Sequence, residues 1–199
     1  MKKIILSISL FFALNTAFSQ SFMNGVGISS MFSTTSKYFT FGGGFTYSPR
    51  FNFVETEKVS VSVGVPLTFA LSISTTTTYD NYYSSQYDST SVGFAFNAPL
   101  LVSLNVGRGS TKENREKFGF FISAGYGFHH GDYLVEGTDA NGYTYVGSRS
   151  LNTNGPAGNA GVRFGVGKKS KNIELRFSYM KGLTGTQPDI FAVAGLFNF

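Results

Sequence analysis

One long alternation of apolar and small or polar residues constrains this chain more than any other feature of its sequence. It runs from Val59 to Ile73, where every odd-numbered residue is valine, leucine, phenylalanine or isoleucine. Because successive side chains of a β-strand point to opposite faces, such a strand has one apolar face and one face of mainly small or polar groups. A typical soluble strand has about 5–6 residues, whereas about 9–11 residues cross a bilayer. The length of this alternation therefore predicts a membrane-spanning strand whose apolar face contacts lipid.

The same alternation recurs along the chain, with no helical spacing of apolar residues after residue 20. The 22 Phe and 11 Tyr favour strands, and no apolar run is long enough for a membrane-spanning helix. We predict an all-β fold, an eight-stranded antiparallel up-and-down transmembrane β-barrel. The predicted strands lie near residues 22–33, 38–53, 58–74, 91–106, 117–131, 154–167, 172–182 and 190–199.

The first residues have the three parts of a secretory signal peptide. Lys2 and Lys3 are followed by an apolar run from Ile4 to Leu14 and by Ala17-Phe18-Ser19. We predict cleavage after Ser19, so that residues 1–19 form the signal peptide and residues 20–199 the barrel domain.

The chain has no Cys, which excludes disulfide bonds and a lipid anchor on cysteine. Loss of the two lysines lowers the formal net charge from +5 to +3, a modest excess that gives no reason to expect nucleic-acid binding.

The connections between the predicted strands alternate in length and in charge. Long polar segments at 75–90 and 132–153 fit extracellular loops, because outer-membrane barrels have long outer loops and short periplasmic turns. Two shorter turns are basic, and we expect their charges at the periplasmic rim near phospholipid headgroups, or simply solvated. These residues are Arg108, Lys112, Arg115, Lys117, Lys168, Lys169 and Lys171.

Two local signals refine this arrangement. The segment Asp139-Ala140-Asn141-Gly142 predicts a tight hairpin turn, since Asn-Gly tolerates positive φ at both turn positions. We therefore expect residues 133–146 to extend two strands beyond the membrane. If the 75–90 segment closes symmetrically, Pro66 falls opposite Pro99, which predicts a shared bend or bulge because proline cannot donate to a ladder.

A signal peptide, eight alternating segments and the ending Phe197-Asn198-Phe199 together resemble small outer-membrane β-barrel proteins of the OmpA/OmpX and PorT-like type. The resemblance implies location in the cell outer membrane, with outer-membrane lipid as a partner. It also implies that Phe197 and Phe199 form a C-terminal insertion signal read by the barrel-insertion machinery; Gly195 departs from the apolar spacing of that signal. The resemblance covers the whole mature chain but carries no motif tied to an activity.

The predicted inward face carries charged residues on two neighbouring strands. Arg163, Glu174 and Arg176 flank the short 167–172 turn with matching parity, so we expect a luminal ion-pair cluster. An anion site is the alternative, because the two arginines outnumber Glu174. An eight-stranded barrel is just wide enough to be filled by side chains, so we expect a plugged polar interior.

Other candidate residues lie near the predicted loops. We predict a contact surface on the 75–90 segment, formed by Tyr79, Tyr82, Tyr83 and Tyr87. The alternative is that these tyrosines anchor the barrel at the membrane interface. His129 and His130 suggest catalysis by a lipid A-modifying barrel enzyme, but Ser123 is about 20 Å from His129 along a strand, too far for a dyad. The two His and absent Cys leave no metal-ligand pattern, and we expect no cofactor.

The sequence thus favours a non-catalytic outer-membrane barrel with a structural or surface-interaction role through its extracellular loops. A component of an envelope or secretion assembly, with a surface or envelope protein as partner, remains the main alternative. A soluble lipocalin-like carrier is the competing fold, but it would need large apolar residues on the inward face.

Overall fold

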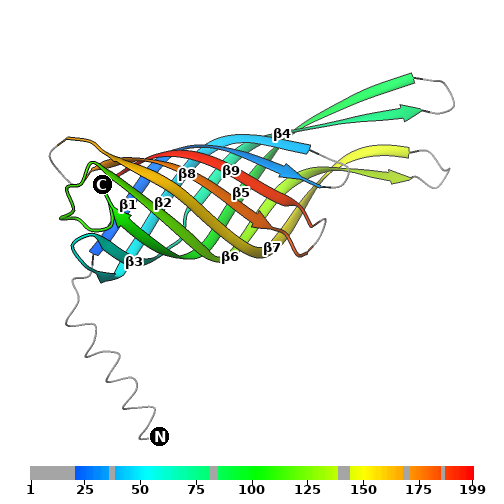
Figure 1. Ribbon diagram of the computed structural model, residues 1–199. Coiled ribbons are helices and arrows are strands. Elements are labelled where there is room, and N and C mark those ends of the chain that lie inside the picture. The colour runs from blue at the N-terminus through cyan, green and yellow to red at the C-terminus, as the bar shows by residue number, and fades with distance from the viewer. Residues whose placement is uncertain (1–20, 36–38, 81–84, 139–143, 168–170, 185–186) are drawn as a thin grey trace, which may run out of the picture.

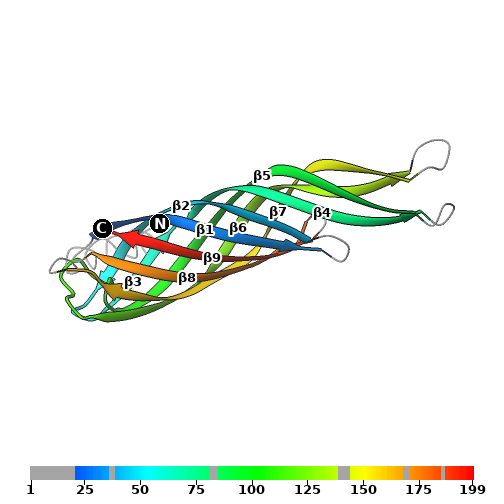
Figure 2. The ribbon, with the colours of Figure 1, turned by 90° about the horizontal axis from the view of Figure 1, so that it is seen from above.

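The computed structural model describes residues 21–35, 39–80, 85–138, 144–167, 171–184 and 187–199, and of 75–89 and 133–146 only the backbone. These residues form nine β-strands whose neighbours are all antiparallel, and the strands close into a ring (Figures 1 and 2). The strands are β1 (Ser21–Thr34), β2 (Phe39–Glu55), β3 (Val59–Gly64), β4 (Leu67–Asp80), β5 (Ser85–Gly107), β6 (Phe118–Thr138), β7 (Thr144–Gly165), β8 (Asn172–Lys181) and β9 (Asp189–Asn198).

The ring has eight positions, because β3 and β4 occupy one of them in turn. Both strands pair with β2 on one side and with β5 on the other. The ring closes where β1 pairs with β9 as well as with β2. The predicted eight-stranded up-and-down barrel is therefore confirmed, and its strands follow the predicted segments closely. Among the described residues, no helix is long and apolar enough to cross a membrane.

The interruption between β3 and β4 lies at the predicted proline pair. The β3–β5 ladder ends at Gly64 opposite Leu101, and the β4–β5 ladder begins at Thr68 opposite Asn97, in the same register. Pro66 and Pro99 therefore face each other across a gap in the ladder, since neither can donate a backbone hydrogen bond. The gap is not a bulge. The register shift in this part of the barrel lies instead on β2, between Asn52 and Val54.

The two faces of the strands differ as the alternation predicts. On β3 and β4 the inward Ser60, Ser62 and Ser72 are buried, whereas the outward Leu71 is 68% exposed. Outward-facing phenylalanine, leucine, isoleucine and valine side chains recur on all neighbouring strands, including Ile28 at 77% exposure. The outer surface of the barrel is thus an apolar band, and the inward face has small and polar residues.

The two ends of the barrel differ in how far the described strands extend. The C-terminus and the β5–β6 turn lie at one end, here called the turn end, and two long hairpins project from the other, the hairpin end (Figure 1). In the β6–β7 hairpin, pairing continues from Gly131 opposite Leu151 to Thr138 opposite Thr144, which confirms the predicted extension. The turn residues 139–142 lie outside the described residues.

The second hairpin shows that much of the long polar segment 75–90, predicted as an outer loop, is paired strand. Strands β4 and β5 stay paired from Thr75 opposite Thr90 to Asp80 opposite Ser85. The run Thr75–Thr78 explains the difference, because β-branched threonine favours extended backbone even where the sequence is uniformly polar.

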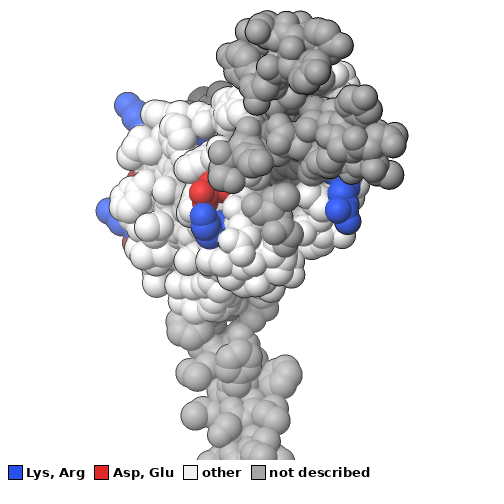
Figure 3. All heavy atoms as spheres, turned by 90° about the vertical axis from the view of Figure 1, so that its right-hand side faces the viewer, with Lys and Arg blue, Asp and Glu red and all other residues white. Residues whose placement is uncertain are grey.

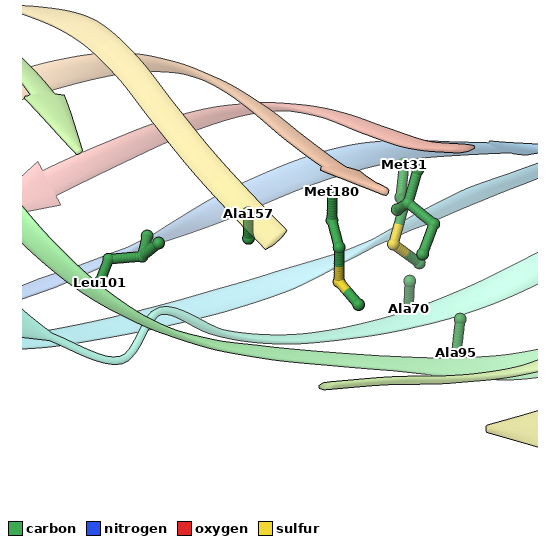
Figure 4. Packing of buried hydrophobic residues seen from close by; sticks show 7 residues of the cluster. Met31, Ala70, Ala95, Leu101, Ala157 and Met180 are labelled. Carbon is green, nitrogen blue, oxygen red and sulfur yellow. The ribbon is translucent and has the colours of Figure 1, made fainter. Parts of the chain in front are cut away.

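The interior is divided along the barrel axis. Toward the hairpin end, Met31, Ala70, Ala95 and Met180 point into the lumen and form an apolar cluster with Leu101, Ala157 and Ile190 (Figure 4). Toward the turn end, the buried inward residues are mainly arginine, asparagine, serine and glutamate. The charged half of this interior is the candidate site.

Candidate functional site

The ion-pair cluster lies on adjacent strands in the charged half of the lumen. Arg163 on β7 is directly opposite Glu174 on β8, and Arg176 follows on the same inward face. The Arg163 Nε lies 2.7 Å from Glu174 Oε2, and the Arg176 Nε lies 2.7 Å from Oε1. Glu174 is completely buried, so both of its oxygens are occupied by guanidinium groups in a water-poor environment. The structure thus brings the three predicted residues together.

Residues from more distant strands complete this cluster. Arg50 on β2 and Arg163 both donate to the side-chain oxygen of Asn105 on β5, at 3.4 Å and 2.9 Å. Phe121 on β6 lies beneath the cluster, with its ring centre 4.3 Å from the Arg163 guanidinium carbon and 5.6 Å from that of Arg176. The sequence pattern did not predict that Arg50 and Asn105 belong to the cluster. The contact of Phe121 with the cluster was also not predicted. In this strand the even-numbered residues are apolar and face outward, so the odd-numbered Phe121 is expected to point inward.

The β5–β6 turn, residues 108–117, folds across the turn end of the lumen. The carbonyl oxygen of Gly109 accepts from Arg50 Nη2 at 2.6 Å and from Arg163 Nη1 at 3.3 Å. The carbonyl oxygen of Ser110 accepts from Asn52 Nδ2 at 2.8 Å and from the Ser60 hydroxyl at 2.6 Å. Two consecutive backbone carbonyls of the turn therefore receive donors from three strands of the barrel wall.

Gly109 is required by this geometry. Its φ is +74°, and a Cβ there would lie 2.8 Å from Asn172 Nδ2 and 2.9 Å from Arg163 Cδ. A side chain would thus meet both backbone strain and the walls of the lumen.

Arg108 corrects part of the predicted basic rim. Its side chain is buried and donates to the carbonyl oxygens of Asn114 at 3.3 Å and Lys171 at 2.8 Å. It therefore holds two turns together rather than facing lipid headgroups. Lys112, Arg115 and Lys117 are exposed as expected, whereas Lys168 and Lys169 lie outside the described residues.

The remaining space inside the barrel is small. Two interior cavities have volumes of about 20 Å³ and about 10 Å³, lined in part by Asn97 and Ser72 respectively. Each is large enough for about one water molecule. An open groove of about 840 Å³ lies outside the turn, between Glu55–Lys58 and residues 111–116. Asn114 ties its two walls together by donating to the Glu57 carbonyl at 2.9 Å.

The two projecting hairpins separate at Asp132. The last β5–β6 pair is Ala95 with Gly131, and beyond it the Asp132 carboxylate accepts from the Phe94 backbone N–H at 2.8 Å and from the Ser150 hydroxyl. The Ser150 hydroxyl first, and then the Phe94 N–H, hold the pKa of the Asp132 carboxyl below its usual range. Asp132 therefore terminates the ladder with a side chain, where the two hairpins diverge.

The predicted tyrosine surface falls on the β4–β5 hairpin. Tyr79 and Tyr87 belong to β4 and β5, where the structure describes the backbone alone. Tyr82 and Tyr83 lie outside the described residues. The contact role of these four tyrosines remains a prediction.

The two histidines point to opposite faces of β6. His129 is buried in the lumen, whereas His130 is partly exposed and its Nδ1 lies 2.7 Å from the side-chain oxygen of Asn152. The Ser123 hydroxyl donates to Ser103 at 2.7 Å rather than to a histidine. Among the described residues, no group of three His, Cys, Asp or Glu side chains is placed to hold a metal ion.

The C-terminal aromatic residues lie on the outer face at the turn end. Phe197 is in β9, and the backbone of Phe199 exchanges hydrogen bonds with Asn24 of β1 at 2.9 Å and 3.2 Å. The two rings are stacked with centres 6.3 Å apart. Both side chains are accessible from outside the barrel, which leaves their role as an insertion signal a prediction.

The chain was compared with protein families, curated proteins and solved structures. No protein-family model and no curated protein matches the chain. Among solved structures, the attachment invasion locus protein Ail of Yersinia pestis, crystallised with the heparin analogue sucrose octasulfate, is similar with a TM-score of 0.53 and 12% identity, over 92% of this chain and 99% of Ail. The outer membrane protein OprG of Pseudomonas aeruginosa is similar with a TM-score of 0.50 and 10% identity, over 92% of this chain and 96% of OprG.

The chain has the fold of small outer-membrane β-barrel proteins. At these identities the likeness concerns the fold and not the activity. The cluster of arginines, the carbonyls of the β5–β6 turn and the split hairpins must therefore be interpreted from this chain alone.

Proposed function

We propose that this protein is a non-catalytic outer-membrane barrel that presents two β-hairpins outside the cell as a contact surface. The observation that carries the proposal is that β4–β5 and β6–β7 continue as paired strands well beyond the rest of the barrel. Extracellular loops of outer-membrane barrels are longer than their periplasmic turns, so we place the hairpin end outside the cell. Secretion through residues 1–19 and insertion through Phe197 and Phe199 belong to this proposal.

The outer surface supports a lipid environment. Large apolar side chains such as Ile28, Leu71 and Val92 are exposed on neighbouring positions around the barrel. A soluble protein rarely exposes a continuous apolar surface of this kind. A lipocalin-like carrier is disfavoured as well, because the interior cavities have room for about one water molecule each.

The hairpins support a contact role through their backbone. Beyond Ala95 on β5 and Gly131 on β6, the described ladders join β5 to β4 and β6 to β7, but not β5 to β6. Unpaired strand edges can add a strand from a partner. Because Asp132 accepts the Phe94 N–H, the base of the gap is closed and its upper part stays available.

The charges at the hairpin end argue against a polyanionic partner. Asp80, Asp88, Asp132 and Glu136 lie on the hairpin strands, against Arg149. The described surface at this end has a few scattered Lys or Arg side chains, one of them beside an acidic group (Figure 3). The sulfated sugar bound by Ail therefore has no extended basic counterpart among the described residues of this chain. A neutral or basic protein surface is the better match.

An epitope inserted between Asn141 and Gly142 tests which side the hairpin occupies. We expect antibody to label intact cells, because this segment connects the projecting strands β6 and β7. The same epitope after Lys169 is the control and should be labelled only in permeabilised cells. Labelling of the first insertion in permeabilised cells alone would contradict the proposal.

A trimmed hairpin tests the contact role. Replacement of residues 134–148 by Asn-Gly joins Tyr133 to Arg149, which are partners in the ladder. We expect cells with the trimmed protein to lose aggregation with one another and attachment to glass, at equal amounts of folded barrel. Unchanged aggregation and attachment would count against a hairpin-mediated role.

The groove at the turn end favours a second candidate, a component of an envelope assembly. Its volume of about 840 Å³ and its mixture of Glu55, Glu57, Lys58 and Arg115 fit a peptide segment with both charge signs. Co-purification of a periplasmic protein in mild detergent, lost when Glu57 and Lys58 are exchanged for the opposite charge, would support this role.

A further inference from the structure

The charged half of the lumen contains more cations than carboxylates. Arg50, Arg163 and Arg176 are buried there with Glu174. Both Glu174 oxygens are taken by Arg163 and Arg176, and Asn198 donates to one of them at 3.1 Å. A buried guanidinium without a counterion is costly, so the remaining positive charge must be offset by other acceptors.

Arg50 is the guanidinium without a carboxylate partner among the described residues. Its acceptors are Asn105 Oδ1 at 3.4 Å, the sulfur of Met23 at 3.2 Å and the Gly109 carbonyl at 2.6 Å. The shortest of these contacts is made to a neutral backbone dipole of the β5–β6 turn. The Arg163 Nη1 donates to the same oxygen at 3.3 Å. Two guanidinium groups thus converge on one carbonyl oxygen.

The neighbouring carbonyl receives the neutral donors of the same region. Ser110 O accepts from Asn52 Nδ2 and from the Ser60 hydroxyl, at 2.8 Å and 2.6 Å. The Asn52 Nδ2 also donates to the Glu55 carboxylate at 2.6 Å, so the Glu55 side chain borders this region on its outer side. The two carbonyl oxygens together therefore occupy a pocket of two cationic and two neutral donors. This is the donor set that recognises oxyanions, because guanidinium groups provide charge and geometry, and hydroxyl and amide groups provide further hydrogen bonds.

We propose that the lumen contains an oxyanion site, built from Arg50, Arg163, Asn52 and Ser60, which the protein occupies with its own Gly109 and Ser110 carbonyls. The ligand class is a phosphate, sulfate or carboxylate group that enters from the turn end. The β5–β6 turn is the competitor for this site, and the anion binds when the turn is withdrawn.

The competition has a physical basis. The turn is tethered at both ends, so its effective concentration at the site is in the millimolar range or higher. A free anion at lower concentration cannot displace it, although a full negative charge neutralises Arg50 better than a carbonyl dipole does. The intact protein therefore keeps the site closed, and removal of the turn exposes it.

A shortened turn tests the proposal directly. Arg108 N donates to Phe118 O at 2.9 Å, so these residues already form a pair that a two-residue Asn-Gly turn can close. We would replace residues 109–117 by Asn-Gly, refold residues 20–199 in detergent micelles, and follow thermal unfolding in sodium sulfate or sodium chloride at equal ionic strength. Sulfate stabilises folded proteins in general, so both proteins should unfold at a higher temperature in sulfate than in chloride. A binding site should make this rise larger for the short-turn protein than for the unmodified protein.

A substitution of Arg50 is the matched control. Arg50→Gln in the short-turn protein should reduce the sulfate effect to that of the unmodified protein, and inorganic phosphate should behave as sulfate does. An equal response of the short-turn and unmodified proteins to sulfate, or an excess response of the short-turn protein that survives Arg50→Gln, would overturn the proposal.

A second measurement keeps the turn intact, in case the short-turn protein does not refold. Lys112 and Arg115 are exposed trypsin sites on the turn. If the turn is held by Arg50, Arg50→Gln should speed cleavage at these sites about tenfold, as loss of a hydrogen bond to a charged group allows. Arg176→Gln removes an equally buried guanidinium that donates to Glu174 and Ser48 rather than to the turn, and it should leave this cleavage rate nearly unchanged. Equal rates in both variants would overturn the proposal.

Discussion

Glu174 shows how a single residue organises the inside of this barrel. It is completely buried on β8, and it accepts hydrogen bonds from Arg163 and Arg176. Those arginines also contact Asn105, Ser48 and the ring of Phe121, so the carboxylate is the anionic centre of a network that joins distant strands. Removal of its charge affects several elements at once.

We predict that Glu174→Gln lowers the free energy of unfolding by about 3–5 kcal/mol, because it leaves two buried guanidinium groups without a carboxylate. Urea unfolding of the protein refolded into lipid vesicles measures the change. Glu113→Gln, on the exposed part of the β5–β6 turn, is the control and should change the stability by less than about 0.5 kcal/mol. Equal losses in the two variants would show that the luminal pair is not a stabilising contact.

Sequence reasoning could find the centre of this network but not its rim. Arg163, Glu174 and Arg176 are joined by one short turn, so parity alone predicts that they meet. Arg50 comes from the opposite part of the chain, and its closeness depends on how the ring closes. The Gly109 carbonyl has no side-chain signature at all, so a basic turn was predicted to face headgroups although its first residues fold into the lumen.

The glycine run of β2 shows the same limit for a whole strand. Gly42, Gly43 and Gly44 look equivalent in the sequence. In the structure, a Cβ at Gly44 would overlap the carbonyl oxygen of Phe69 and the Cα of Ala70, whereas a Cβ at Gly43 has no atom within 4 Å. The close approach of β4 to β2 therefore depends on one glycine of the run.

We predict that Gly44→Ala lowers the free energy of unfolding by about 1–3 kcal/mol, because β4 must move away from β2 to admit the methyl group. Gly43→Ala should be neutral or stabilising by up to about 1 kcal/mol, since glycine inside a strand is costly and the added methyl group faces outward. Urea unfolding of both refolded proteins compares these neighbouring positions. A larger loss for Gly43→Ala would contradict the packing of β4 on β2.

The strands themselves could be predicted well, because a period of two over a long stretch has few other interpretations. The strand ends could not be predicted where the sequence is polar on both faces. Residues 75–80 and 85–90 have no apolar alternation, and only their threonine content indicates extended backbone. The division between β3 and β4 was visible as a proline pair, but its form depended on the register of β2 and β5.

At the scale of the whole molecule, the proposed function depends on whether lipid or water surrounds the outer face of the barrel. The same closed ring could carry a ligand in water or span a bilayer, and the difference lies in which face is apolar. Here the inward face combines ion pairs, hydroxyls and small apolar residues, while the outward face is apolar on neighbouring strands. Ile28 lies midway along β1 and is 77% exposed, so it reports directly on the surrounding medium.

We predict that Ile28→Arg lowers the free energy of unfolding by about 2–4 kcal/mol in lipid vesicles, the cost of an arginine near the bilayer midplane. In a barrel surrounded by water, the same change at an exposed position would fall within about 0.5 kcal/mol of neutral. Ser148→Arg is the matched control, because Ser148 is exposed on the projecting part of β7, where water should surround it in either case. A loss confined to Ile28→Arg means that lipid covers the barrel and ends at the base of the hairpins. Two neutral substitutions would instead mean that the barrel is surrounded by water, and the outer-membrane function would have to be abandoned.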